Sequence, residues 1–206
     1  MNAPFEWLGR QDYQPMWERL KHHADLVALG HADEVVWACE HEHVYTTGRR
    51  GIDNRLEYQV SVPWVVSDRG GETTYHGTGQ LMLYPIIHIR ARGLGVRQYI
   101  YQLEQSAIDV LADYGVKGER KDGFPGVWLG ERKIAAMGVR VAKGVAYHGM
   151  ALNMNVDMKY FHAINPCGTG MAAINMQDVC DNMPDMKTLA AHWAVKMSIQ
   201  GRNIHV

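Results

Sequence analysis

Residues 126–138 read Gly126-Val-Trp-Leu-Gly-Glu-Arg-Lys-Ile-Ala-Ala-Met-Gly138, two apolar runs on either side of a short turn at residues 130–132. Apolar runs separated by a few turn residues, one of them glycine, predict a β-hairpin. Another extended run follows from Val145 to Val156. Because strands joined by short turns pair antiparallel, this stretch predicts a mostly antiparallel sheet.

The rest of the chain supplies more strands and the helices that cover them. Runs rich in Val, Ile, Trp and Tyr predict strands at Glu34 to Tyr45, Trp64 to Ser67 and Leu81 to Ile89. Apolar residues at three- and four-residue steps predict helices at Tyr13 to Leu29, Val96 to Tyr114, and Met186 to Met197 after an Asp185 cap. Strands and helices in this mixture give an α+β fold, a mixed and mostly antiparallel sheet flanked by helices. No repeat or linker divides residues 1–206, so we expect a single domain.

Composition and charge exclude several classes of protein. Apolar residues make up 47% of the 206 residues and charged residues 21%, the usage of an ordinary globular protein. Twenty-one Lys and Arg against 22 Asp and Glu give no one-sided charge for binding nucleic acid or anionic lipid. The sequence shows no signal peptide and no apolar run long enough to cross a membrane, so a cytoplasmic location is expected.

Three segments have side chains suited to chemistry. Arg69-Gly-Gly-Glu-Thr-Thr-Tyr-His-Gly-Thr-Gly-Gln80 concentrates glycines with polar side chains and indicates either a ligand-binding loop or a glycine-rich hairpin. Lys133 lies among apolar residues, where burial would lower the pKa of its amine, although an exposed hairpin lysine is the commoner case. Cys167, in Asn165-Pro-Cys-Gly168, lies on an expected tight turn and is a candidate nucleophile, provided that a nearby ammonium stabilises its thiolate.

The other cysteines suggest core positions or, less readily, a metal site. Three cysteines without a CxxC pair argue against a disulfide framework. Cys39 and Cys180 are expected in the core. Cys39, His41 and His43 alternate and would share one side of a strand, a spacing that could hold zinc, but no suitable fourth ligand is evident. We therefore expect no metal.

These segments, in this order, resemble the lipoate-protein ligase B family, the octanoyl-[acyl carrier protein]:protein octanoyltransferases. The resemblance rests on the Arg69 to Gln80 segment with Tyr84-Pro85, on His41-Glu-His-Val-Tyr-Thr-Thr-Gly-Arg-Arg50, on Gly126 to Gly138, on Tyr147-His-Gly-Met-Ala-Leu-Asn153 and on Asn165-Pro-Cys-Gly168. The sequence departs from the family pattern at Thr78, where proline is common, and at Leu83, commonly glycine, which would alter the width of the acyl tunnel.

The resemblance implies a fold similar to the biotin and lipoate ligase catalytic core, and an acyltransferase (lipoyl(octanoyl) transferase) catalysing the first step of protein lipoylation. Cys167 would carry the acyl group as a thioester and Lys133 would shuttle its proton. No cofactor and no ATP would be needed, because the donor is already a thioester. The partners would be acyl carrier protein, and as acceptors the lipoyl domains of 2-oxoacid dehydrogenase complexes and the glycine cleavage H protein. The substrate-binding residues would be Arg69, Gly70, Gly71, Glu72, Thr73, Thr74, Tyr75, His76, Ala136, Met137, Gly138, Gly149, Met150 and Ala151.

Two alternatives remain open at this point. An ATP-dependent lipoate or biotin ligase would use the same scaffold but would need no cysteine, so Cys167 argues against it. A non-catalytic acyl- or metal-binding regulator would account for the histidines and the glycine-rich loop. Backbone N–H groups near Gly168 or in the Arg69 to Gly79 loop are candidates for holding the oxyanion of an acyl transfer.

Overall fold

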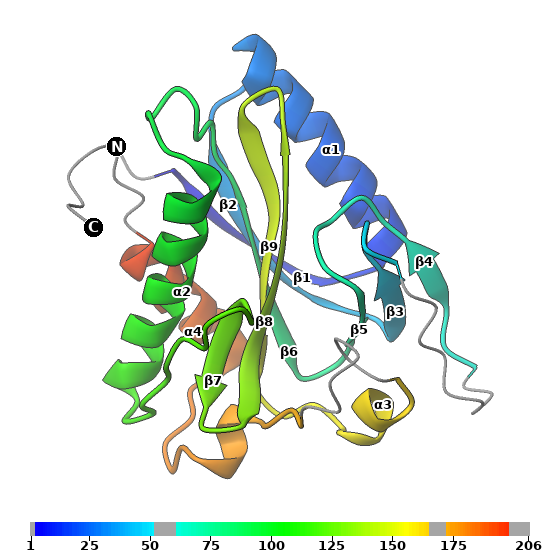
Figure 1. Cartoon of the computed structure of the whole chain (residues 1–206), viewed down its shortest axis with the longest axis vertical. Coiled ribbons are helices and arrows are strands. Elements are labelled where there is room, and N and C mark those ends of the chain that lie inside the picture. Colours follow the sequence, from blue (N-terminus) through cyan, green and yellow to red (C-terminus); the bar gives the residue numbers. More distant parts are fainter. Residues whose placement is uncertain (1–2, 52–60, 165–171, 198–206) are drawn as a thin grey trace.

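A computed structural model describes residues 3–51, 61–164 and 172–197 of the chain. Its centre is a six-stranded sheet in the order β1-β2-β6-β9-β8-β7, in which β1 runs parallel to β2 and the other neighbours are antiparallel (Figure 1). The strands are β1 (Phe5–Gln11), β2 (Val35–His41), β6 (Gln80–Ile86), β7 (Gly126–Leu129), β8 (Arg132–Ala142) and β9 (Val145–Asn153). The expected mixed, mostly antiparallel sheet is confirmed.

The β8–β9 hairpin is longer than the sequence predicts. Its ladder runs from Ala135 opposite Leu152 to Ala142 opposite Val145. Lys143 and Gly144 close it, both with positive φ (52° and 89°), the backbone that a two-residue hairpin turn requires. This long pair of strands is the wall on which the site described below is built.

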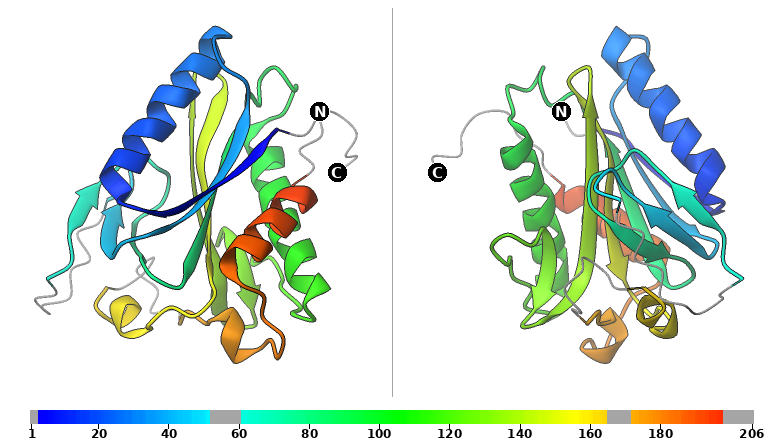
Figure 2. Two further views of the ribbon diagram at one scale, coloured as in Figure 1. Left: turned by 180° about the vertical axis from the view of Figure 1, so that it is seen from behind. Right: turned by 45° about the vertical axis from the view of Figure 1, so that its right-hand side comes forward.

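Helices cover both faces of the sheet. Helix α1 (Tyr13–Leu29) lies on one face, and α2 (Val96–Asp113) and α4 (Met186–Lys196) lie on the other (Figures 1 and 2). Each helix follows its predicted range because its apolar stripe has a sheet face to cover. Asp185 caps α4 as expected, accepting a hydrogen bond from the Thr188 N–H at 3.0 Å.

A smaller sheet, β4-β3-β5, stands beside the large one and corrects one prediction. It comprises β3 (Val44–Thr47), β4 (Trp64–Val66) and β5 (Thr73–His76). The single strand predicted from Glu34 to Tyr45 is therefore wrong, since β2 ends in the large sheet and β3 begins three residues later in the small one. The prediction failed because the connecting residues, Glu42 and His43, are not turn formers.

Four short elements were not predicted from the sequence, one of them the 3-10 helix η2 (Met176–Asp178). Strand β1 adds an edge to the large sheet, β5 carries part of the glycine-rich segment, and a one-turn helix, α3 (Lys159–His162), packs beside β5. Phe161 of α3 joins a third apolar cluster with Tyr45 and Tyr75. The small sheet and α3 thus form one unit at the end of the molecule where the candidate site lies (Figure 1).

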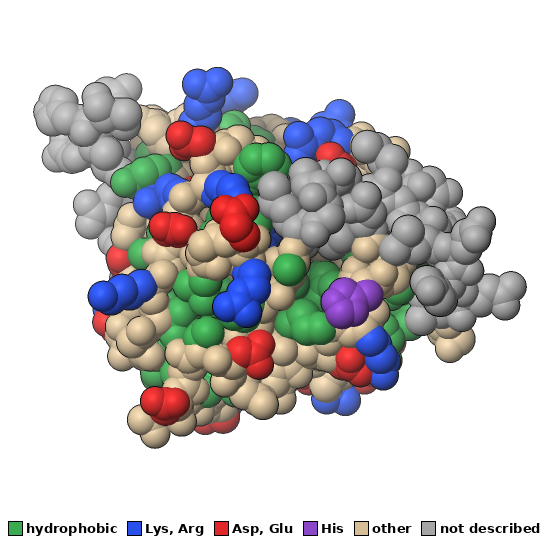
Figure 3. All heavy atoms as spheres, turned by 60° about the horizontal axis from the view of Figure 1, so that its bottom comes forward, with side chains coloured by type: hydrophobic (Ala, Val, Ile, Leu, Met, Phe, Trp, Pro, Cys, Tyr) green, Lys and Arg blue, Asp and Glu red, His purple; other side chains and the backbone are tan. Residues whose placement is uncertain are grey.

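The surface at that end mixes charges of both signs. On the face that Figure 3 brings forward, Lys and Arg side chains alternate with Asp and Glu around hydrophobic ones. A strongly basic patch of the kind that binds nucleic acid is not seen on the described part of this face. Among the described residues, no helix is both long enough and apolar enough to cross a bilayer.

Candidate active site

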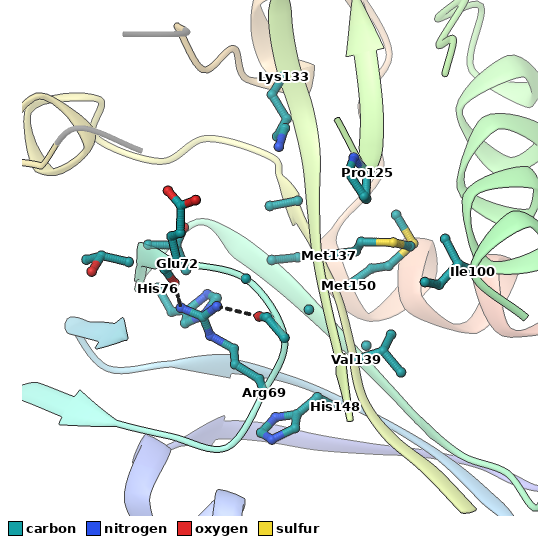
Figure 4. Close-up of a pocket in the computed structure, with 18 of the residues that line it drawn as sticks. Arg69, Glu72, His76, Ile100, Pro125, Lys133, Met137, Val139, His148 and Met150 are labelled. Atoms are coloured by element: carbon teal, nitrogen blue, oxygen red, sulfur yellow. Dashed lines mark hydrogen bonds between the residues drawn. The ribbon is translucent and has the colours of Figure 1, made fainter. Parts of the chain in front are cut away.

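A cavity of about 820 Å³ opens between the large sheet and the glycine-rich loop (Figure 4). Strands β8 and β9 form one wall, and residues 69–74 of the loop form the facing wall. Met137, Met150 and Ile100 line a part of the cavity on the α2 side of the sheet, whereas Lys133, Glu72 and His76 line the part on the other side (Figure 4). The lining is mainly apolar with a few charged groups, as in sites for small organic ligands.

Arg69 holds the glycine-rich loop in shape. Its side chain is buried, and all three guanidinium nitrogens donate to protein oxygens. Nη2 donates to the Thr46 carbonyl at 2.6 Å and to the Glu72 carbonyl at 2.7 Å, and Nη1 donates to the Gly70 carbonyl at 2.9 Å. The arginine therefore ties the loop to β3, and these bonds direct its charge at the protein's own backbone.

Glycines allow the loop to lie directly against the sheet. The Gly70 N–H donates to the Val139 carbonyl of β8 at 3.1 Å. A Cβ atom on Gly70 would approach that carbonyl to 2.9 Å, and a Cβ atom on Gly138 would approach the Gly70 carbonyl to 2.8 Å. Both contacts are shorter than a carbon and an oxygen tolerate, so only glycine permits this spacing between the two walls.

Asp68 anchors the start of the loop from the other side. Its carboxylate accepts hydrogen bonds from Trp17 Nε1 at 2.7 Å, from His148 Nε2 at 2.9 Å and from the Tyr147 hydroxyl. Burial raises the pKa of Asp68, but these hydrogen bonds outweigh burial and hold the pKa well below its usual value. The carboxylate therefore stays ionised and joins α1, β9 and the loop.

His148 adopts a backbone conformation that β-strand residues rarely use. Its φ is +60°, in the left-handed region. This turns its side chain toward the same carboxylate as its neighbour Tyr147, whereas consecutive residues of a regular strand point to opposite faces. Asp68 and His148 are the site residues that sequence reasoning missed; the available signal was their position beside the quoted Arg69 and Gly149 segments.

A buried polar chain lies behind the cavity. His76 Nδ1 bonds to Gln80 Oε1 at 2.7 Å, and Gln80 Nε2 donates to Asn153 Oδ1 at 2.9 Å. Because Gln80 Oε1 can only accept, His76 carries its proton on Nδ1. Burial, reinforced by the nearby Arg69 charge, lowers the pKa of His76 far below its usual value. The His76 imidazole is thus neutral and forms part of the cavity wall.

Lys133 lies in the cavity wall at the start of β8, half-buried. Its Nζ lies 4.6 Å from the centre of the Trp128 ring, a cation–π distance. The backbone N–H of Lys133 donates to the Ala172 carbonyl at 2.9 Å, and the backbone carbonyl of Lys133 accepts from the Ile174 N–H at 3.1 Å. The strand that carries Lys133 is thereby paired with residues 172–174, a segment that begins five residues after Cys167 in the sequence.

The structure brings most of the predicted site residues together. The described residues from the prediction that line the cavity are Lys133, Arg69, Gly70, Gly71, Glu72, Thr73, Thr74, His76, Ala136, Met137, Gly138, Gly149, Met150 and Ala151. Tyr75 is not among them: it is buried in the small-sheet cluster and stacks on Tyr160 at 4.7 Å. Leu83 is likewise not among the described lining residues and lies in the core on the α2 side, where it pairs with the lining residue Met150. Cys167 falls outside the described residues.

The proposed zinc ligands separate. His41 lies on β2, its Nδ1 2.9 Å from the Gln11 carbonyl and its Nε2 2.7 Å from the Tyr84 hydroxyl. His43 instead faces the small sheet, where it contacts the Tyr75 hydroxyl. No cluster of three or more metal-binding side chains occurs in residues 3–51, 61–164 and 172–197.

Comparison with known sequences gives a consistent family. Residues 12–198 match the lipoyl protein ligase A/B catalytic domain. An octanoyltransferase of Chromohalobacter salexigens is 40% identical over 96% of this chain and 90% of its own length. An octanoyltransferase of Dechloromonas aromatica is 43% identical over 91% of this chain and 88% of its own.

Comparison with solved structures shows the same fold at low sequence identity. A lipoate protein ligase of T. acidophilum with bound lipoic acid superposes with a TM-score of 0.69 at 14% identity, covering 96% of this chain and 86% of that one. The biotin protein ligase of Aquifex aeolicus in complex with biotin and ATP gives a TM-score of 0.59 at 14% identity, covering 95% and 68%. The expected biotin and lipoate ligase core is confirmed.

Proposed function

Because this chain belongs to the lipoyl protein ligase A/B catalytic domain family, we propose that it is an octanoyltransferase that uses acyl carrier protein as donor and lipoyl-domain lysines as acceptors. Its curated relatives with that name are 40–46% identical over most of the chain. The proposal extends their activity to this protein and assigns Cys167 as the nucleophile and Lys133 as its proton partner.

The pairing of Lys133 with the segment after Cys167 is the observation that carries this assignment. Residues 172–174 lie beside Lys133, and Ile164, which precedes Cys167 in the sequence, packs in the small-sheet cluster. Cys167 is five residues from Ala172 and three from Ile164, so chain length limits it to about 18 Å and about 11 Å from their α-carbons. Ala172 lines the same cavity as Lys133, and so does Phe161, three residues before Ile164.

The chemistry balances in two steps. In the first, the Cys167 thiolate attacks the octanoyl carbonyl, its S–C bond forms, and the C–S bond to phosphopantetheine breaks while the Lys133 ammonium gives the departing sulfur a proton. In the second, the acceptor amine attacks the enzyme thioester, a C–N bond forms and the bond to Cys167 breaks, and Lys133 accepts the proton that nitrogen loses. One thioester replaces another and an amide then forms, so the reaction uses no ATP and no cofactor.

The charges around the cavity suit an acidic donor protein. Arg49 and Arg50 line the cavity, and both are exposed. Exposed arginines at the entrance attract a negatively charged partner and its phosphate-bearing arm. We assign acyl carrier protein as the donor on this ground, and the lipoyl domains of 2-oxoacid dehydrogenase complexes and the glycine cleavage H protein as acceptors.

We further place the protein in the cytoplasm and treat residues 1–206 as one catalytic domain. Cys39 and Cys180 are free and buried, which suits a reducing compartment. Each apolar cluster combines residues that are far apart in the sequence, as Tyr45 and Phe161 are in the small-sheet cluster, which supports a single domain.

Mass spectrometry of the protein mixed with octanoyl-acyl carrier protein, without ATP, tests the proposal. We expect one octanoyl group attached at Cys167 and its transfer to an added lipoyl domain. Cys167→Ala should abolish the adduct and Lys133→Ala should slow its formation by at least about 100-fold. Cys180→Ala, which changes a buried cysteine outside the cavity, should still form the adduct. Transfer that requires ATP and free octanoate would indicate a ligase instead, and an unchanged Cys167→Ala variant would refute the assignment.

A further inference from the structure

The cavity is strongly cationic apart from one side chain. Arg49, Arg50, Arg69, Lys133 and Arg140 all line it, whereas Glu72 is the one acidic residue among the described lining residues. A cationic cavity favours an acidic donor but repels the ammonium of an acceptor lysine. An acceptor that must enter the same cavity therefore needs a local negative charge.

Glu72 has a fixed backbone and one carboxylate oxygen without a partner in the described part of the chain. Its carbonyl accepts from Arg69 Nη2 at 2.7 Å and from the Gly48 N–H at 3.2 Å, so its backbone is held firmly. Its Oε2 atom is buried and has no hydrogen-bond partner within the described part of the chain. A buried charged oxygen without a partner costs stability, and such a group in a cavity wall suggests a ligand that completes it.

The position of Glu72 suits the second half of the transfer. Figure 4 shows its carboxylate reaching into the cavity from the loop, on the wall that faces Lys133 of β8. An amine placed between these two side chains would have a carboxylate on one side and the proposed proton acceptor on the other. The thioester of the proposed function would lie beside the same space.

We propose that Glu72 is the recognition residue for the acceptor lysine, pairing with its ammonium as that side chain enters the cavity. This inference rests on the proposed function and names the group that admits its second substrate. The carboxylate offsets the surrounding positive charge and orients the nitrogen. The ammonium releases one proton to solvent before it attacks, and Lys133 accepts the second as the C–N bond forms and Cys167 leaves as the thiolate. Charge-assisted hydrogen bonds to an ion of this kind are among the strongest available in proteins.

The two half-reactions allow a selective test. Thioester formation is measured by rapid mixing with octanoyl-acyl carrier protein, and transfer is measured by adding a lipoyl domain to the preformed acyl-enzyme. The quantity compared is the transfer rate at low lipoyl-domain concentration divided by the rate of thioester formation. In Glu72→Gln this ratio should fall about tenfold, mainly because KM for the lipoyl domain rises. Glu72→Asp, which keeps the charge on a shorter side chain, should recover part of that loss. The matched control is Glu18→Gln on the exposed face of α1, which should keep the wild-type ratio.

Deacylation by hydroxylamine distinguishes a loss of lysine recognition from a general loss of thioester reactivity. It is a neutral nucleophile near pH 7.5 and cleaves thioesters without needing a counter-charge, so it should deacylate the Glu72→Gln thioester as fast as the wild-type one. Equal ratios in wild type and Glu72→Gln, or an equal slowing with hydroxylamine and with the lipoyl domain, would overturn the inference alone. A wild-type protein that forms no thioester would overturn the proposed function and the inference together.

Discussion

His41 should make the stability of the protein depend on pH between 8 and 5. Burial lowers the pKa of His41 from 6.5 to about 4, and the hydrogen bond to the Gln11 carbonyl offsets only part of this effect. Because that carbonyl can only accept, Nδ1 carries the proton and Nε2 accepts from the Tyr84 hydroxyl. The folded protein thus holds this histidine in its neutral form.

The sign and size follow from this difference in proton affinity. At pH 8 His41 is neutral in both the folded and the unfolded chain. As pH falls below 6.5 the unfolded chain takes up a proton that the folded chain refuses until about pH 4, so stability falls. At pH 5 the loss relative to pH 8 is about 2 kcal/mol, and it approaches about 3 kcal/mol at pH 4.

Urea unfolding followed by tryptophan fluorescence at pH 8 and pH 5 measures this loss in wild type and in His41→Gln. Glutamine offers a donor and an acceptor but does not titrate, so the variant should lose about 2 kcal/mol less than wild type between the two pH values. With an m-value of about 2 kcal/mol per molar, this difference is roughly 1 M in the urea midpoint. His31→Gln, a change at an exposed histidine, should behave like wild type. Equal losses in wild type and His41→Gln would refute the reasoning.

Three further changes probe packing, capping and the anchored loop. Gly149→Ala should destabilise by at least about 3 kcal/mol in thermal melts, because the new Cβ would lie 2.0 Å from the Leu83 carbonyl oxygen; a melting temperature within about 1 °C of wild type would contradict this. Asp185→Ala should cost about 1 kcal/mol in urea unfolding through the lost α4 cap, and Asp185→Asn, which keeps a capping oxygen, should cost much less. Asp68→Asn should lower the free energy of unfolding by about 1–3 kcal/mol and raise KM for the octanoyl donor, because an amide cannot accept all the hydrogen bonds that the carboxylate accepts. Unchanged stability and KM would show that Asp68 does not hold the loop.

The helices were the part of the fold that sequence predicts best. Helix α1 begins and ends at the predicted residues because its apolar stripe is regular and Gly30 follows it in the left-handed conformation, with φ of 73°. The β7–β8 hairpin was predicted for the same kind of reason, an apolar pattern interrupted by turn residues. Local pattern is sufficient where an element's own residues determine both its period and its ends.

The sequence could not predict which strands pair with one another or which side chains face the cavity. His41 and His43 are two residues apart and looked like neighbours on one strand, yet His41 ends β2 of the large sheet, whereas His43 lies in the connection to β3 and contacts Tyr75 of the small sheet. Tyr75 lies within the glycine-rich segment but turns into the small-sheet cluster, whereas His76, the next residue, lines the cavity. Which side chain faces a ligand depends on long-range pairing, which single-sequence patterns do not encode.

The contacts of Arg69 bear on inhibitor design. Its guanidinium N–H groups donate to carbonyls of its own loop and of β3, so a free fatty acid entering the cavity would feel its charge but would not meet a fork of donors at this arginine. Compounds that imitate the acyl chain should accordingly gain little from a terminal carboxylate aimed at Arg69. An uncharged head group, such as a ketone or an amide, is the better starting point for a tight-binding analogue.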